Sequence, residues 1–211
     1  MLLPCDGVLF DVDGTLVDST PLIERAARVW APEYGIDPDA YLARAHGRRT
    51  SDSIADFLPA GQVRAATERL DALEAAEVAG VTALPGVVDL LSSLRGLPWA
   101  VVTSMDPGQL TARAGAAGVP LPKVAVTARD VAAGKPDPAG YLLAARRLGL
   151  DPARCVVVED APAGVAAGRA AGATVVALTT SHSRADLAEA DVIVPDLTAV
   201  TAEPGGLRVR A

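Results

Sequence analysis

One short stretch near the start of the chain most constrains what it can fold into. Residues 7–10, Gly-Val-Leu-Phe, form an apolar run with the length and composition of a buried strand. The run ends in Asp11 and Asp13, and Gly14 then lets the backbone turn tightly. Ligands of open α/β sheets bind beyond the carboxyl ends of the strands. The pattern therefore predicts a buried strand that places two carboxylates at a binding site.

These two carboxylates leave several interpretations open. A hard divalent cation such as Mg2+ would offset their repulsion, or one carboxyl could carry a proton and act as an acid. An ordinary turn that closes a strand fits the pair about equally well, because Asp and Gly are common in turns. A calcium loop of the EF-hand type does not fit, since its twelfth position counted from Asp11 is Leu22 rather than Glu.

Length and charge narrow the class of protein. The chain has 211 residues, of which 50% are hydrophobic and 3% aromatic, which favours a packed core over disorder. A formal net charge of −7 does not favour nucleic acid or an anionic membrane surface. We see no apolar run that could span a bilayer and no signal-type leader, so we expect a cytoplasmic protein. Cys5 and Cys155 adjoin predicted strands and are interpreted as core residues.

The order of the expected elements indicates an α/β core with an insert. Residues 18–83 are helical in pattern, whereas strands and helices alternate after Leu84-Pro85-Gly86. This alternation predicts a Rossmann-like, doubly wound parallel sheet built from residues 1–17 and 84–211, with a small all-helical cap of residues 18–83 inserted after the first strand. Residues 201–211 are expected to be loosely held. The later strands are expected at 99–102, 124–127, 155–158, 174–178 and 192–194, and the later helices at 87–94, 109–117, 141–148, 165–171 and 184–190.

Polar residues also follow later strands. Thr103 and Ser104 end one strand with hydroxyl and backbone N–H groups that suit a phosphate, although a helix cap would have the same residues. Lys135 lies between Gly and Pro on a stiff turn, where it could hold an anion or simply be exposed. Glu159 and Asp160 end a run of three valines, and burial of this acidic pair without a cation would be costly.

Together, these groups are suited to phosphoryl transfer onto a carboxylate. A phosphate ester and an attacking carboxylate are both anions, and each unit-charge repulsion costs roughly 4 kcal/mol at about 4 Å and an effective dielectric near 20. Mg2+ and Lys135 would offset this repulsion. Asp11 would attack phosphorus and form an aspartyl-phosphate, while Asp13 would protonate the leaving alcohol and then deprotonate the hydrolytic water.

Four segments resemble, in order, the motifs of haloacid-dehalogenase-like phosphatases. They are Asp-Val-Asp-Gly-Thr-Leu-Val-Asp-Ser at 11–19, Val-Val-Thr-Ser at 101–104, Gly-Lys-Pro-Asp-Pro at 134–138 and Val-Val-Glu-Asp-Ala-Pro-Ala-Gly at 157–164. The resemblance implies that Asp11 is the nucleophile and a metal ligand and that Asp13 is the acid/base, with its backbone carbonyl on Mg2+. It also implies phosphate ligands at Thr103, Ser104 and Lys135, and metal ligands at Asp160 and Glu159.

The cap segment His46-Gly47-Arg48-Arg49-Thr50 resembles one found in glycerol-3-phosphate and 2-deoxyglucose-6-phosphate phosphatases. It implies that His46 and Arg49 reach the substrate, whereas Arg48 is assigned to a solvated face. We therefore expect a monomeric, Mg2+-dependent phosphatase of a small sugar or polyol phosphate, without nucleic-acid or membrane partners. A phosphomutase of the β-phosphoglucomutase type and a non-catalytic binding protein on the same scaffold are the alternatives.

Overall fold

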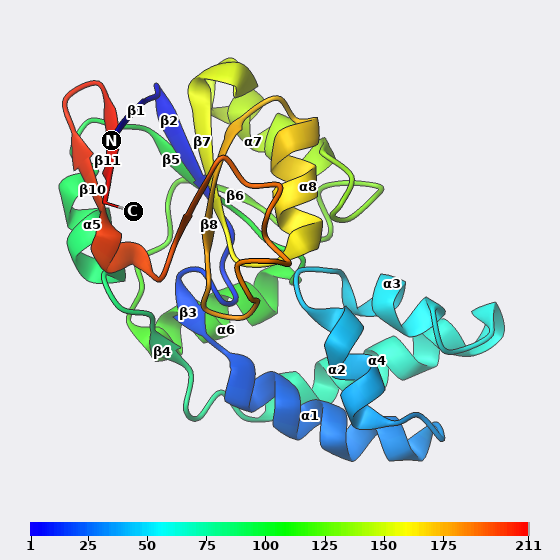
Figure 1. Ribbon diagram of the computed structural model, residues 1–211. Helices are drawn as coiled ribbons and strands as arrows, with labels where there is room; N and C mark the ends of the chain where they lie inside the picture. The colour runs from blue at the N-terminus through cyan, green and yellow to red at the C-terminus, as the bar shows by residue number, and fades with distance from the viewer. Residues whose placement is uncertain (211) are drawn as a thin grey trace.

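A six-stranded parallel sheet forms the centre of the molecule (Figure 1). The computed structural model describes residues 1–210. The strand order is β6-β5-β2-β7-β8-β9, and every neighbouring pair is parallel. This arrangement confirms the expected α/β class. The strands are β2 (Gly7–Phe10), β5 (Trp99–Val102), β6 (Val124–Val126), β7 (Cys155–Glu159), β8 (Thr174–Leu178) and β9 (Val192–Val194).

Helices cover both faces of this sheet, which explains why its strands are continuous apolar runs. Side chains alternate across a strand, so Val8 and Phe10 belong to one buried cluster and Leu9 to another. The first cluster includes Leu110 of α6, and the second includes Tyr141 of α7. The helices that follow the insert are α5 (Val87–Ser93), α6 (Pro107–Ala117), α7 (Ala139–Leu148) and α8 (Pro162–Ala170).

The segment inserted after β2 forms a separate helical layer at one end of the sheet (Figure 1). A short antiparallel ribbon of β3 (Val17–Asp18) and β4 (Thr82–Ala83) connects it to the core. The helices have their own apolar cluster, in which the buried indole of Trp30 donates a hydrogen bond to the Ala66 carbonyl at 2.9 Å. They are α1 (Thr20–Glu33), α2 (Pro38–Ala45), α3 (Thr50–Ala55) and α4 (Ala60–Ala76).

The expectation of a helix at 184–190 is wrong, because the structure has successive turns there. Most of the backbone hydrogen bonds in this segment join residues three apart, such as Asp186 N–H to the Ser183 carbonyl at 3.1 Å. The Ser183 hydroxyl also donates to the Asp186 carboxylate at 2.5 Å, a local bond that competes with helix formation.

The expectation of a loose C-terminal tail is also wrong for the described residues, and Ala211 lies outside them. Strands β10 (Val200–Glu203) and β11 (Gly206–Val209) form an antiparallel hairpin that pairs with β1 (Leu2–Pro4), near the N-terminus. Leu207 and Val209 are fully buried, as their alternation along a strand requires. None of the helices in residues 1–210 combines the length and hydropathy that a bilayer crossing requires.

Candidate active site

The turn after β2 brings the first acidic motif next to the end of β7. The Asp11 N–H donates to the Val158 carbonyl at 3.0 Å, which continues the pairing of β2 with β7. Gly14 then adopts a φ of +79°, which disfavours any residue with a side chain. A Cβ at this position would also overlap the Asp160 carboxylate. Glycine is therefore required for the loop to approach Asp160.

Lys135 lies between two buried carboxylates. Its Nζ contacts Asp11 Oδ1 and lies 2.6 Å from Glu159 Oε1, and the side chains of Lys135, Asp11 and Glu159 are 5%, 6% and 0% exposed. The Tyr141 hydroxyl donates to the same Glu159 oxygen at 2.5 Å, and the Asp160 N–H donates to the other at 3.1 Å. Both oxygens of Glu159 are thus occupied by donors from the protein, and one of these donors is the ammonium of Lys135.

The buried cluster has more negative than positive charge. One carboxylate oxygen from each of Asp11, Glu159 and Asp160 lies within 4.8 Å of the others. Burial and the neighbouring carboxylates raise the pKa of Asp11 well above its ordinary value and that of Asp160 to about 7. Burial alone would lower the pKa of Lys135, but Asp11 and Glu159 raise it. A set of anionic oxygens with one ammonium fits a hard divalent cation such as Mg2+.

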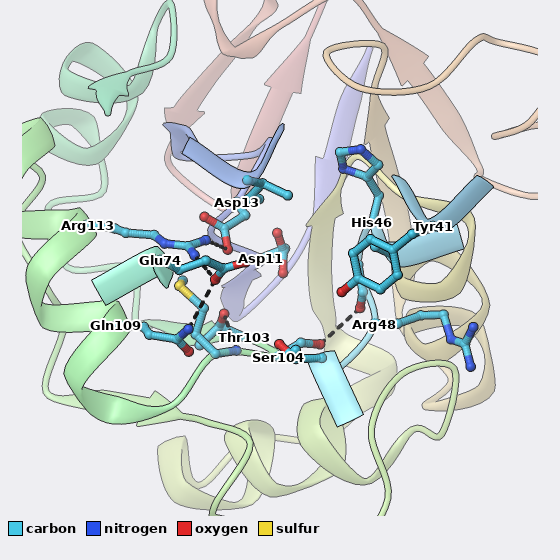
Figure 2. A pocket seen from close by; sticks show the side chains of 15 residues that line it. Asp11, Asp13, Tyr41, His46, Arg48, Glu74, Thr103, Ser104, Gln109 and Arg113 are labelled. Carbon is cyan, nitrogen blue, oxygen red and sulfur yellow. Dashed lines mark hydrogen bonds and ion pairs between the residues drawn. The ribbon is translucent and has the colours of Figure 1, made fainter. Parts of the chain in front are cut away.

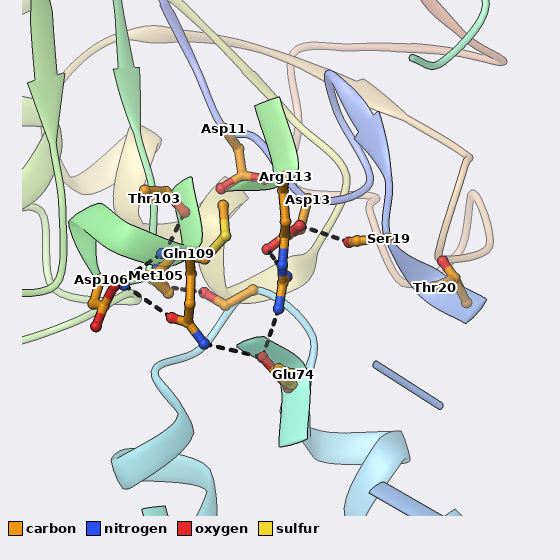
Figure 3. Close-up of polar contacts among 12 residues, drawn as sticks. Asp11, Asp13, Ser19, Thr20, Glu74, Thr103, Met105, Asp106, Gln109 and Arg113 are labelled. Carbon is orange, nitrogen blue, oxygen red and sulfur yellow. Dashed lines mark hydrogen bonds and ion pairs between the residues drawn. The ribbon is translucent and has the colours of Figure 1, made fainter. Parts of the chain in front are cut away.

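Asp13 lies at the edge of this cluster, and its carboxylate has a partner on each oxygen. The Ser19 hydroxyl donates to Oδ1 at 2.6 Å, and Arg113 of α6 donates to Oδ2 at 2.7 Å. The other terminal nitrogen of Arg113 donates to Glu74 of α4 at 2.5 Å. Burial raises the pKa of Glu74 to about 7, although Arg113 opposes this shift. These contacts join the end of the core that carries Asp13 to the inserted helices (Figure 3).

Arg113 and Glu74 are not among the residues expected from the sequence, although both leave a signal there. Arg113 follows Leu110 by three residues, on the face of α6 that is buried. Glu74 follows Leu70 by four, on the buried face of α4. An ionisable residue in the apolar phase of a helix needs a partner when it is buried. That signal could have identified each residue, but not the pairing between them.

The hydroxyl residues after β5 lie in the same cavity. Thr103 is buried, and Thr103 and Ser104 line the cavity with Asp11 and Asp13 (Figure 2). Ser104 also donates to the backbone carbonyl of Gly47 at 2.9 Å and so connects the core to the cap. The cavity has a volume of about 70 Å³. The structure therefore gathers the predicted hydroxyls beside the predicted carboxylates.

The two cap residues that were expected to reach the substrate, His46 and Arg49, lie in different places. His46 lines the cavity. Its pKa is lowered, chiefly by burial and to a smaller extent by the nearby His182. Arg49 points instead to the loop before Lys135, where it donates to the carbonyls of Val131 at 2.7 Å and Ala132 at 3.1 Å. Arg49 thus makes a contact between cap and core in this structure.

Arg48 is not on a freely solvated face, contrary to expectation. Its guanidinium pairs with Asp56 at 2.6 Å, its side chain is 26% exposed, and it lines the cavity shared with Asp13. The pairing arises because the turn at Gly47 brings Arg48 beside the end of α3, where Asp56 lies.

Comparison with known proteins is consistent with this site. The chain is 46% identical to hexitol phosphatase A of Escherichia coli over 209 residues, which cover 96% of this chain and 97% of that protein. It is 37% identical to 2-deoxyglucose-6-phosphate phosphatase 1 of Saccharomyces cerevisiae, with 93% and 89% covered. The crystal structure of a hydrolase from Pseudomonas syringae superposes with a TM-score of 0.83 at 27% identity, covering 90% of this chain and 94% of that one.

The family model described as haloacid dehalogenase-like hydrolase matches residues 5–172, which include Asp11, Thr103 and Glu159 at the ends of β2, β5 and β7. The matched span covers most of the chain and agrees with the four motifs in the sequence. The chain therefore belongs to the haloacid dehalogenase-like hydrolases.

Proposed function

We propose that the protein is a Mg2+-dependent phosphatase that releases inorganic phosphate from a small sugar or polyol phosphate through an aspartyl-phosphate. The observation that carries this proposal is the position of Lys135, whose buried ammonium contacts Asp11 and Glu159 beside Asp160. The names of the relatives, which are phosphatases of hexitol and 2-deoxyglucose phosphates, support the substrate class.

Each residue of the site has a role in this proposal. Asp11 attacks phosphorus, and the bond to the leaving oxygen breaks with the proton supplied by Asp13. Asp13 then accepts a proton from the water that cleaves the aspartyl-phosphate. Lys135 and the hydroxyls of Thr103 and Ser104 hold the phosphoryl oxygens.

The cation would be held by Asp11, Asp160 and the backbone carbonyl of Asp13. When bound, Mg2+ supplies positive charge that screens the nucleophile from the phosphate and stabilises the equatorial oxygens. We assign Glu159 chiefly to holding Lys135, because its Oε1 accepts from both the Lys135 ammonium and the Tyr141 hydroxyl.

We also propose that residues 18–83 act as a cap that closes over the substrate. The supporting observations are the short ribbon of β3 and β4 that joins them to the core and the cavity that lies between the two parts. His46 would contact substrate hydroxyls from the cap side of this cavity. Arg49 would reach the phosphate only after it left the carbonyls of Val131 and Ala132.

The test of the proposal is Asp11→Asn, which keeps the size of the side chain but removes the nucleophile. We expect phosphate release from glycerol-3-phosphate and sugar phosphates to fall by about 10³-fold or more, as for other essential nucleophiles. The matched control is Asp89→Asn, an exposed aspartate of α5, which should leave the rate unchanged. Full activity of Asp11→Asn would refute the proposal.

The mutase alternative would use the same residues and return the phosphoryl group to a sugar. It needs a second phosphate to be held on the cap, but the buried cap residue that faces Asp13 across Arg113 is the acidic Glu74. Free phosphate that is released in proportion to consumed substrate would identify a phosphatase. An isomeric sugar phosphate without free phosphate would identify a mutase.

A further inference from the structure

A chain of polar contacts joins the cap to the proposed acid/base residue (Figure 3). Gln109 and Arg113 lie one turn apart on α6, so both face α4 of the cap. The Gln109 side-chain carbonyl accepts a hydrogen bond from the Asp106 N–H at 3.0 Å, and its amide donates to Glu74 at 3.1 Å. The same amide lies 3.3 Å from Asp71. Helix α6 therefore offers two donors to one buried carboxylate of the cap.

Arg113 is the member of this chain that touches both parts of the protein. One terminal nitrogen lies 2.7 Å from Asp13 and the other 2.5 Å from Glu74, and the Arg113 side chain is only 3% exposed. Two carboxylates on opposite sides of one guanidinium hold its plane in a fixed direction. Because Glu74 belongs to the cap, any motion of α4 away from α6 would remove one of the two partners.

We propose that Arg113 is a positioning residue for Asp13 and that Glu74 makes this positioning depend on the closed cap, an inference that rests on the proposed function. With α4 in place, Glu74 and Gln109 fix Arg113, and Arg113 and Ser19 fix the two oxygens of Asp13. With α4 displaced, Arg113 is free to move with Asp13 as a single pair. Asp13 therefore has its reactive orientation only when the cap covers the substrate.

The proposal predicts an effect that depends on the leaving group. An alkyl phosphate, such as a sugar or polyol phosphate, releases an alcohol that needs a proton as the bond to phosphorus breaks. An aryl ester such as p-nitrophenyl phosphate releases a stable phenolate that leaves without one. Loss of Asp13 positioning should therefore slow the alkyl ester far more than the aryl ester.

The experiment compares kcat/KM for glycerol-3-phosphate and p-nitrophenyl phosphate in Glu74→Gln and Arg113→Lys. We expect each substitution to slow the alkyl ester about 10- to 100-fold, part of the roughly 10²–10⁴-fold that general acid–base catalysis contributes. The aryl ester should change less than about 3-fold, because kcat/KM reports the steps up to phosphoryl transfer onto Asp11, in which a phenolate needs no proton from Asp13, and excludes the later hydrolysis of the aspartyl-phosphate. The ratio of the two rates does not depend on the fraction of folded protein, so Glu74→Gln decides the question even if Arg113→Lys folds poorly.

One exposed carboxylate and one half-exposed guanidinium serve as matched controls. Glu68→Gln removes an exposed carboxylate of α4 that pairs with Arg64 at 3.4 Å, and it should leave both rates unchanged. Arg169→Lys removes a half-exposed guanidinium of α8 that lies 3.9 Å from Asp191, with the same expectation.

A double-mutant cycle separates this inference from the proposed function. In an Asp13→Asn background, Glu74→Gln should cause no further loss with either ester. Equal losses for the two esters, or a further loss without Asp13, would overturn the positioning role while leaving the phosphatase intact. Absence of phosphate release by the unmodified protein from both esters in Mg2+ would refute the proposed function instead.

Discussion

In the absence of divalent cations, the free energy of unfolding of the protein should fall as the pH rises. Asp160 has an ordinary pKa of 3.8, which burial and the neighbouring Glu159 raise to about 7 in the fold. A carboxyl whose pKa is raised by folding binds its proton more tightly in the native state. The contribution of Asp160 to the free energy of unfolding is fully present below pH 3.8 and is lost as the pH rises to about 7. This direction is opposite to that of a carboxylate in a favourable ion pair.

The size of the effect follows from the two pKa values. The interval from 3.8 to about 7, at about 1.4 kcal/mol for each pH unit, corresponds to a loss of about 4 kcal/mol in the free energy of unfolding. Bound Mg2+ would hold the ionised carboxylates and restore this energy. A ligand stabilises by about 2.7 kcal/mol at 100 times its Kd and by about 4 kcal/mol at 1,000 times.

The assay is urea unfolding followed by far-ultraviolet circular dichroism at pH 5 and pH 8, with either EDTA or saturating Mg2+ at matched ionic strength. We expect Mg2+ to raise the free energy of unfolding by several kcal/mol at pH 8 and by much less at pH 5. In Asp160→Asn, which lacks this titrating carboxyl, the dependence on pH should become weaker, and the remainder should come from Asp11 and Glu74, whose pKa values are also raised by burial. An equal effect of Mg2+ at both pH values, or none at either, would refute the assignment of a cation to this cluster.

Two further substitutions test the close packing of the site and the independence of the cap. Gly164→Ala places a Cβ where it would overlap the Glu159 carboxylate. We expect this substitution to displace Glu159 from Lys135 and to lower kcat by about 10-fold or more, because displacement by about 1 Å can lower a rate 10²-fold. The control Gly115→Ala, where a Cβ has open space, should leave kcat unchanged. Trp30→Ala removes the largest buried side chain of the cap cluster and should destabilise the cap by about 3–5 kcal/mol. Limited proteolysis should then cut residues 18–83 before it cuts the sheet. Simultaneous cutting of both parts would contradict the independence of the cap.

The order of the elements and the gathering of the site were predictable from the sequence because their signals are local. Each strand is a short apolar run, and each run stops at polar residues, such as Asp11, Thr103 and Glu159. The carboxyl ends of parallel strands meet at one edge of a sheet, so residues that are distant in the sequence were expected to converge there. The contact of Lys135 with Asp11 and Glu159 agrees with this expectation.

Other features depend on which partner lies opposite a segment, and no local pattern contains that information. The C-terminal hairpin of β10 and β11 is ordered because β1, about 200 residues away, pairs with it. A helical pattern at 184–190 gives way to turns, and the bond from the Ser183 hydroxyl to Asp186 competes with the helix there.

The sequence by itself determined the α/β class and the polar residues at the strand ends, because apolar periodicity and the ends of parallel strands are properties of the chain. Only the tertiary structure decided that Arg113 joins Asp13 to Glu74 and that Arg49 faces a backbone loop. The physical reason is that a buried charge requires a partner, but the identity of that partner depends on which helix the fold places against it.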